Sequence, residues 1–430
     1  MTATPSSAIG TRRKAFSLGT VQALVRLVCS FASVKLTAVY LGPSGLALIA
    51  QFNNFVNLCQ GIIVTGLETA TMRLSAEYGA DAERLRRLLA TVGKVGLGLG
   101  LPTALGMSVA SPWLASWLLK DSAYAWVFVL GSIGVLAAIL NAVLLAVLTT
   151  RGEISRVVSS NILATICGLL VFAPAAMHWG VRGGLYASSC LYICALLVTL
   201  ILLTRTSVLG WRDFVGRLDR GEARRIAGFY PMLVFHAVMA PLSLILIREH
   251  VTSQLSLESA GLWQACWRLS ETYTMVVMMS VTTQFMARLG EVANHPDRLR
   301  AEVLRTLGAS VGATAAMALC IFVLREWIVR LIFSRAFSPV TELMPMQLVG
   351  DVLKMAGWTL GFVLVATVRS RWYIAIELVV PLVFIVMARV LGASMGVSGV
   401  TMAYVAAGAA QCLMAFVALR DVIFIRRPAS

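Results

Sequence analysis

Three polar side chains interrupt an apolar stretch that begins at Gly261. Gln264, Arg268 and Glu271 follow one another at spacings of four and three residues. In an α-helix this spacing places all three side chains on one face. A charge at the centre of a bilayer costs about 3 kcal/mol on insertion scales, so such a face is expected to meet a cavity or a partner helix rather than lipid.

Two other apolar stretches carry the same spacing. One stripe is charged and consists of Gln347, Asp351 and Lys354. The other is uncharged and consists of Asn53, Asn57 and Gln60. If the halves of the chain pack across a cleft, we expect these stripes to meet it near the middle of the membrane, where transporters bind their substrates.

Single cations add candidates for anion binding. Arg26 lies near the middle of the first apolar stretch and has no acid three or four residues away. Lys35 lies on the opposite helix face, so it either faces a cavity or extends to the membrane surface. Arg73 has Glu77 one turn later and is read either as a solvated helix end or as a further ligand.

The acids leave two readings open. Arg268 with Glu271, and Asp351 with Lys354, fit either a binding site or i,i+3 ion pairs that hold helices together. Glu68 and Glu377 are also deep in apolar sequence. Each fits a proton- or ion-coupling site, as Glu271 and Asp351 do, or a hydrogen bond between helices.

The composition indicates a polytopic membrane protein with only helices. Hydrophobic residues make up 59% of the 430 residues, charged residues 13%, and the mean hydropathy is +0.83. The net charge of +16 lies mostly in short loops, so it predicts no nucleic-acid partner. The sequence shows no phosphate-binding loop, catalytic constellation, cofactor motif or metal-ligand spacing, and its eight cysteines lie in apolar stretches. We therefore expect neither an enzyme nor a cofactor.

A requirement of about 20 apolar residues for each membrane crossing predicts twelve spans. They are 15–41, 44–76, 85–110, 122–149, 155–177, 182–204, 225–249, 257–288, 299–324, 344–368, 371–391 and 396–424. The loops on the side of the termini and the termini themselves hold 23 Lys and Arg, against seven on the other side. Those seven are Lys120, Arg182, Arg248, Arg325, Arg330, Arg335 and Arg389. The positive-inside rule then predicts that both termini are cytoplasmic.

The spans divide into two sets of six. Residues 206–224 alternate apolar and charged side chains and predict an amphipathic helix on the cytoplasmic surface. This linker would separate an N-terminal lobe, 1–205, from a C-terminal lobe, 225–430. A weak repeat supports the division, because Glu83-Arg-Leu-Arg86 recurs as Asp297-Arg-Leu-Arg300.

Several of these segments resemble the Wzx-type flippases of lipid-linked oligosaccharides, a family that includes O-antigen translocases and enterobacterial common antigen flippases. The resemblance is carried by Gly261-Leu-Trp-Gln264 with Leu-Ser-Glu271, Gln347-Leu-Val-Gly-Asp-Val-Leu-Lys354 with Gly361 and Arg371-Trp-Tyr373, Leu41-Gly-Pro-Ser-Gly45 and Leu85-Arg-Arg87. It implies the V-shaped, two-lobed fold of the multidrug/oligosaccharidyl-lipid/polysaccharide (MOP) exporters, which includes the MATE transporters.

The resemblance also implies a substrate and a role. An undecaprenyl-pyrophosphate-linked oligosaccharide would cross from the inner to the outer leaflet of a bacterial inner membrane by alternating access, its headgroup in a cationic central cavity. Polysaccharide polymerase and chain-length proteins are candidate partners in the biosynthesis of O-antigen and lipopolysaccharide. The implied substrate ligands are Arg26, Lys35, Asn53, Asn57, Arg73, Trp263, Gln264, Arg268 and Lys354.

Two alternative functions stay open, and one position departs from the family pattern. An ion-coupled multidrug exporter of the same superfamily would be expected to have an acid-rich site. A scaffold of a polysaccharide assembly complex would use its buried charges only to hold helices together. Relatives are often basic where this chain has Asn53 and Asn54, which weakens the case for pyrophosphate binding by the second span.

Overall fold

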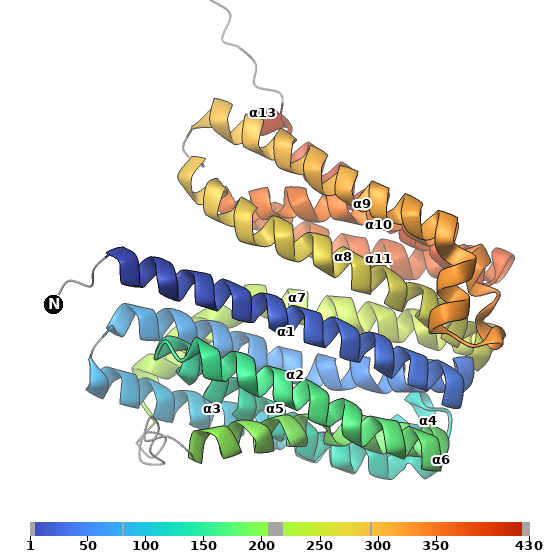
Figure 1. The fold of residues 1–430 in the computed structure, drawn as a ribbon, viewed down its shortest axis with the longest axis horizontal. Coiled ribbons are helices and arrows are strands. Elements are labelled where there is room, and N and C mark those ends of the chain that lie inside the picture. Colours follow the sequence, from blue (N-terminus) through green and yellow to red (C-terminus); the bar gives the residue numbers. More distant parts are fainter. Residues whose placement is uncertain (1–4, 80, 205–217, 293–294, 424–430) are drawn as a thin grey trace, which may run out of the picture. The chain divides into compact units, whose positions relative to one another are not determined.

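The computed structural model describes residues 5–79, 81–204, 218–292 and 295–423. All regular structure in these ranges is helical, as the composition predicts (Figure 1). The α-helices are α1 (Pro5–Tyr40), α2 (Gly42–Tyr78), α3 (Ala82–Val109), α4 (Ser111–Leu118), α5 (Ala125–Thr150), α6 (Ile154–Thr204), α7 (Arg220–Gln254), α8 (Leu257–Val292), α9 (Pro296–Ile332), α10 (Val340–Ala366), α11 (Ser370–Met395), α12 (Val397–Ala418) and α13 (Arg420–Ile423).

Nine helices within the described residues are long and apolar enough to cross a membrane. The chain is thus a multi-pass membrane protein. One of the nine, α6, covers two predicted spans, 155–177 and 182–204, with a break at Gly180, whose φ is 57°. The seventh and eighth predicted spans coincide with α7 and α8, which are not among the nine. The count of twelve stays a prediction.

The chain forms two compact units. Unit 1 consists of residues 1–41 and 48–241, and unit 2 of residues 42–47 and 242–430. One of the three boundaries lies between α1 and α2, and the other two fall inside α2 and α7, so each of these two helices contributes to both units. The predicted linker at 206–224 falls mainly on residues 205–217, which lie outside the described residues.

In unit 1 the long helices α1, α3, α5 and α6 pack side by side (Figure 1). The ring of Phe52 meets that of Phe128 edge-on, with their centroids 5.5 Å apart. A polar cluster fastens the first part of α7 to α2. Arg225 donates to Glu77 Oε2 at 2.7 Å and to the Tyr78 hydroxyl at 2.7 Å, and that hydroxyl donates to Glu222 at 2.5 Å.

In unit 2, α10 packs against α8, α9 and α12, and α12 also packs against α11. Small residues let α10 and α12 approach closely, as in many membrane helix pairs. A Cβ atom on Gly350 would lie 2.4 Å from the Tyr404 ring, so only glycine leaves room for that ring against α10. The core contains Trp263 and Trp267 of α8, Phe384 of α11 and Tyr404 of α12. This aromatic core carries the polar site described next.

Candidate functional site

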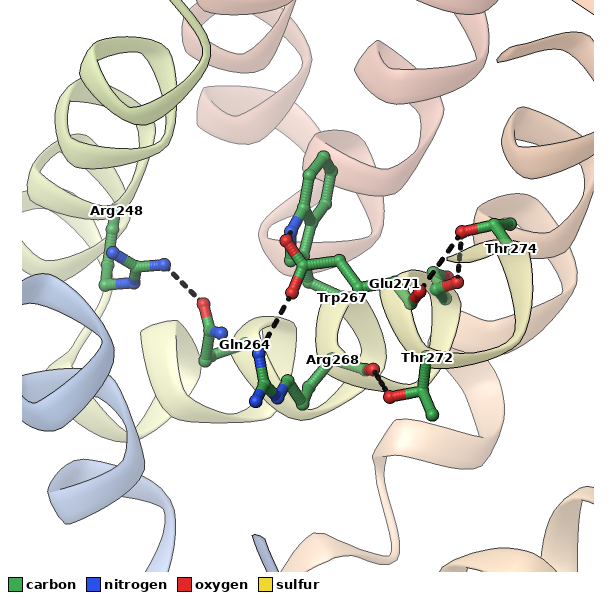
Figure 2. Close-up of polar contacts among 8 residues, drawn as sticks. Arg248, Gln264, Trp267, Arg268, Glu271, Thr272 and Thr274 are labelled. Carbon is green, nitrogen blue, oxygen red and sulfur yellow. Dashed lines mark hydrogen bonds and ion pairs between the residues drawn. The ribbon is translucent and has the colours of Figure 1, made fainter. Parts of the chain in front are cut away.

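Arg248 is the first of the polar groups in unit 2. The sequence predicts it at the outer end of the span 225–249, whereas α7 continues to Gln254 and Arg248 is buried inside the helix, with 1% of its surface exposed. Its guanidinium donates to the Gln264 side-chain oxygen (Figure 2) and lies 5.6 Å from the Trp263 ring centroid. The predicted span ends at 249 because polar residues follow it in the sequence. Sequence reasoning missed that the helix continues through these polar residues.

The stripe of α8 forms the ion pair between Arg268 and Glu271 that is one of the two arrangements its spacing predicts. Arg268 Nη1 lies 3.4 Å from Glu271 Oε2, and Trp267 Nε1 donates to Glu271 Oε1 at 2.8 Å (Figure 2). The pair is not sealed in the core, since the two charged side chains are 43% and 44% exposed. Glu271 thus joins a cation and an aromatic ring while staying accessible.

The stripe of α10 does not form the ion pair considered for it. Asp351 is 1% exposed and accepts hydrogen bonds from Tyr273 at 2.8 Å and Tyr404 at 2.9 Å. Two tyrosine hydroxyls, on α8 and α12, donate hydrogen bonds to this carboxylate, and Lys354 does not. Sequence reasoning missed both tyrosines because they lie 78 and 53 positions from Asp351.

Lys354 sits among aromatic rings. Its Nζ atom lies 4.8 Å from the Trp267 centroid, 4.7 Å from that of Trp358 and 5.3 Å from that of Tyr404. These distances are those of cation–π contacts. The Tyr404 side chain therefore contacts both members of the stripe, through its hydroxyl at Asp351 and its ring at Lys354.

Gln347 completes this stripe, and its amide is unusual. It is 1% exposed, and neither its nitrogen nor its oxygen has a partner among the described residues. It lines a small cavity, of about 10 Å³, together with residues of α8, α9 and α10, which include Ser270, Tyr273 and Met344. A buried amide without a partner is costly, so this cavity is a weak point in the packing of unit 2.

The other predicted residues of unit 2 are placed differently. Trp263 is 0% exposed and packs edge-on against Phe384, with 6.4 Å between their centroids, so its face is closed to a sugar ring in this conformation. Gln264 is 7% exposed and bound to Arg248. Glu377 is partly buried on α11.

In unit 1, the amide stripe of α2 reaches α6. Tyr192 donates to Asn57 Oδ1 at 2.9 Å, and Gln60 donates to Asn57 at 2.8 Å and to Tyr192 at 2.7 Å. Asn53 is partly buried. Tyr192 is the partner that sequence reasoning missed. The cluster offers amide and hydroxyl groups of the kind that bind sugars.

The charged candidates of unit 1 are exposed within the unit. This holds for Arg26 and Lys35 on α1 and for Glu68 and Arg73 on α2. In the part of the chain that the structure describes, Arg26 and Lys35 form no ion pair. No group of three His, Cys, Asp or Glu there is placed to hold a metal ion.

Comparison with known proteins gives this site a context. The sequence profile of the family described as "Polysaccharide biosynthesis protein" matches residues 38–342. The lipid III flippases of Escherichia coli (strain K12) and Shigella flexneri are each 25% identical over 383 residues, covering 89% of this chain and 92% of theirs.

Solved structures show the same fold. An inward-facing multidrug resistance MATE family transporter of the MOP superfamily gives a TM-score of 0.77 at 14% sequence identity. The alignment covers 93% of this chain and 98% of that one. The lipid II flippase MurJ in an inward closed conformation gives 0.75, with 14% identity, 93% of this chain and 87% of that one. The chain has the fold of the MOP superfamily and belongs to the polysaccharide biosynthesis protein family.

Proposed function

We propose that the chain is a flippase that moves an undecaprenyl-pyrophosphate-linked oligosaccharide from the cytoplasmic to the periplasmic leaflet of a bacterial inner membrane. One observation carries the proposal: the likeness to two lipid III flippases extends over 89% of the chain. The proposal makes it a transporter rather than an enzyme, with both termini in the cytoplasm.

The side chains of the membrane helices suit such a headgroup. A pyrophosphate must exchange its water for other hydrogen-bond donors to cross, and guanidinium and ammonium groups supply charge-assisted ones. Arg26 and Lys35 in unit 1 and Arg268 and Lys354 in unit 2 are the proposed cations. The cluster of Asn57, Gln60 and Tyr192 supplies groups for sugar hydroxyls. Alternating access would release the headgroup on the other side.

A multidrug exporter is the nearest rival, because the fold is shared with MATE transporters at a TM-score of 0.77. At 14% identity this likeness speaks only for the fold. The two functions differ in the charge of the substrate. An exporter of cationic drugs needs acids without a cation beside them. In unit 2, Asp351 is buried against two tyrosines, and the accessible Glu271 is paired with Arg268.

The test is a flipping assay with the purified full chain in proteoliposomes, using a fluorescent polyprenyl-pyrophosphate-linked sugar. The wild type is expected to move the lipid, and Arg26→Ala and Arg268→Ala to slow it, while Lys120→Ala, a change on an exposed residue outside the membrane helices, serves as the control. Undiminished transport by both arginine variants would remove the proposed role of these two arginines. Transport of cationic drugs but not of the lipid would favour the exporter.

A further inference from the structure

We propose that Lys354 is the residue of unit 2 that binds a phosphate oxyanion of the substrate, and that its three aromatic neighbours hold the ammonium ready for it. The inference rests on the proposed function and deepens it. It distinguishes Lys354 of α10 from Arg248 of α7 and Arg268 of α8, the two other cations of the polar site described above.

The three cations differ in what satisfies them. Arg248 is 1% exposed and donates to Gln264. Arg268 is neutralised by Glu271 at 3.4 Å. Lys354 is partly exposed and forms no ion pair or hydrogen bond among the described residues. An ammonium has three N–H donors, and aromatic faces stabilise its charge more weakly than charge-assisted hydrogen bonds to an oxyanion do. Lys354 is therefore the cation of these three whose N–H groups meet no oxygen acceptor among the described residues.

The acids around Lys354 do not cancel this role. Asp351, Glu271 and Glu377 act on Lys354 through space, but none of them forms an ion pair with it. The carboxylate of Asp351 accepts from Tyr273 and Tyr404, and that of Glu271 from Trp267 and Arg268. Because no carboxylate contacts the Lys354 ammonium directly among the described residues, a phosphate that reaches it does not have to displace one first.

The rings themselves are held in place. Trp267 is fixed by its bond to Glu271, and its ring stacks on Phe384 at 6.0 Å between centroids. Tyr404 is fixed by its bond to Asp351 and lies against Gly350. An ammonium held by fixed rings loses little conformational freedom on binding, which favours affinity.

The experiment measures binding to the full chain in lipid nanodiscs. The probes are geranylgeranyl pyrophosphate, the uncharged geranylgeraniol and inorganic pyrophosphate. Lys354→Met keeps the length of the side chain and removes its charge. We expect it to weaken binding of geranylgeranyl pyrophosphate about tenfold or more and to leave geranylgeraniol binding unchanged. Lys354→Arg should recover most of the loss, and Arg268→Met should cost about threefold or less, since Glu271 already neutralises that charge.

The controls separate this inference from the proposed function. Lys120→Met is the matched change on an exposed loop lysine and should bind all probes as the wild type does. Lys354→Gln is a second neutral variant, used if the methionine variant does not fold. An equal loss for both prenyl probes, or wild-type affinity for the pyrophosphate in the folded neutral variants, overturns the role of Lys354 alone. A wild type that does not bind the prenyl pyrophosphate overturns both proposals. Tighter binding of inorganic pyrophosphate than of its prenyl form would show an anion site unrelated to the lipid and would also overturn them.

Discussion

The two units of this chain differ in the contacts that the charged side chains of their membrane helices make. In unit 2, Arg248, Arg268, Glu271, Asp351 and Lys354 all contact a defined side chain from their own helix or a neighbouring one. In unit 1, Arg26 and Lys35 are exposed and form no ion pair among the described residues, and the cluster of Asn57, Gln60 and Tyr192 is uncharged.

The difference shows that the intramembrane charges are not equivalent. A stripe that contains acid and base builds a fixed arrangement, because each buried charge must be satisfied by another group. The stripe of amides in unit 1 bonds to one tyrosine, a neutral partner. We therefore expect substitutions in the polar site of unit 2 to lower the free energy of unfolding more than substitutions in the polar cluster of unit 1. Unfolding measurements on variants test this expectation.

The largest loss of stability is expected from truncation of Trp267. Trp267→Ala removes the ring beneath Lys354, the stacking on Phe384 and the donor to Glu271. We expect it to lower the free energy of unfolding by about 3–5 kcal/mol, the range for truncating a buried tryptophan. Equilibrium unfolding of the full chain in mixed micelles measures the loss. The control, Trp327→Ala, truncates a side chain that is 70% exposed and should change stability by about 0.5 kcal/mol or less.

Removing the hydroxyl of Tyr404 in unit 2 and that of Tyr192 in unit 1 compares the stability of the two polar sites directly. Tyr404→Phe leaves the ring at Lys354 and removes a buried hydrogen bond to a carboxylate, so we expect a loss of about 1.5–3 kcal/mol. Tyr192→Phe removes hydrogen bonds to two neutral amides, of which Asn57 is exposed, with an expected loss of about 0.5–1.5 kcal/mol. Equal losses would contradict the distinction between the units. Thermal and denaturant unfolding of the two variants side by side give the comparison.

A gain is expected at Gln347. Gln347→Met keeps the volume and removes an amide whose two polar atoms have no partner among the described residues. Stability should rise by about 1 kcal/mol, because the desolvation cost of the amide disappears. The same unfolding measurement applies, with Gln411→Met on α12, which is 9% exposed, as a comparison. A clear loss at Gln347 would mean that a bound molecule in the cavity satisfies the amide.

The smallest effect is expected outside the membrane helices. Arg369 donates to Asp421 Oδ1 at 2.7 Å and so lowers the pKa of that carboxyl below its usual value. A lowered pKa stabilises the fold above the usual aspartate value, near pH 3.9, and the contribution is lost as the pH falls through the lowered pKa. Because the Asp421 side chain is 61% exposed, we expect about 0.5 kcal/mol or less.

The measurement for this pair is the pH dependence of stability. Unfolding of the wild type and of Asp421→Asn is compared between about pH 6 and about pH 2. The two curves should differ slightly at the upper end and converge at the lower end. A difference as large as that at Tyr404 would show that surface pairs of unit 2 matter as much as its buried ones.

The sequence predicted the class of fold well and the site only in part. Helix length and hydropathy are local properties, so the all-helical membrane fold and the polar faces of α8 and α10 could be read from spacing alone. The i,i+3 contact of Arg268 with Glu271 was within reach for the same reason. The partners of Asp351 and Lys354 come from α8 and α12, and no periodicity indicates which tyrosine meets which acid.

Arg248 shows a second limit of sequence reasoning. It lies at the polar end of the predicted span 225–249, and hydropathy cannot tell a helix that continues with buried polar groups from one that ends. Burial of its guanidinium against Gln264 and Trp263 depends on the packing of α7 on α8. Such contacts follow from the tertiary arrangement, and the sequence alone does not specify them.

The most direct test of the proposed transport is the fate of the lipid-linked oligosaccharide in cells that lack this chain. We predict that a deletion strain accumulates the undecaprenyl-linked oligosaccharide in the cytoplasmic leaflet. The wild-type gene and Lys120→Met should both clear it, whereas Lys354→Met should not. A deletion strain in which the lipid-linked oligosaccharide reaches the periplasmic leaflet at the normal rate would contradict the proposal.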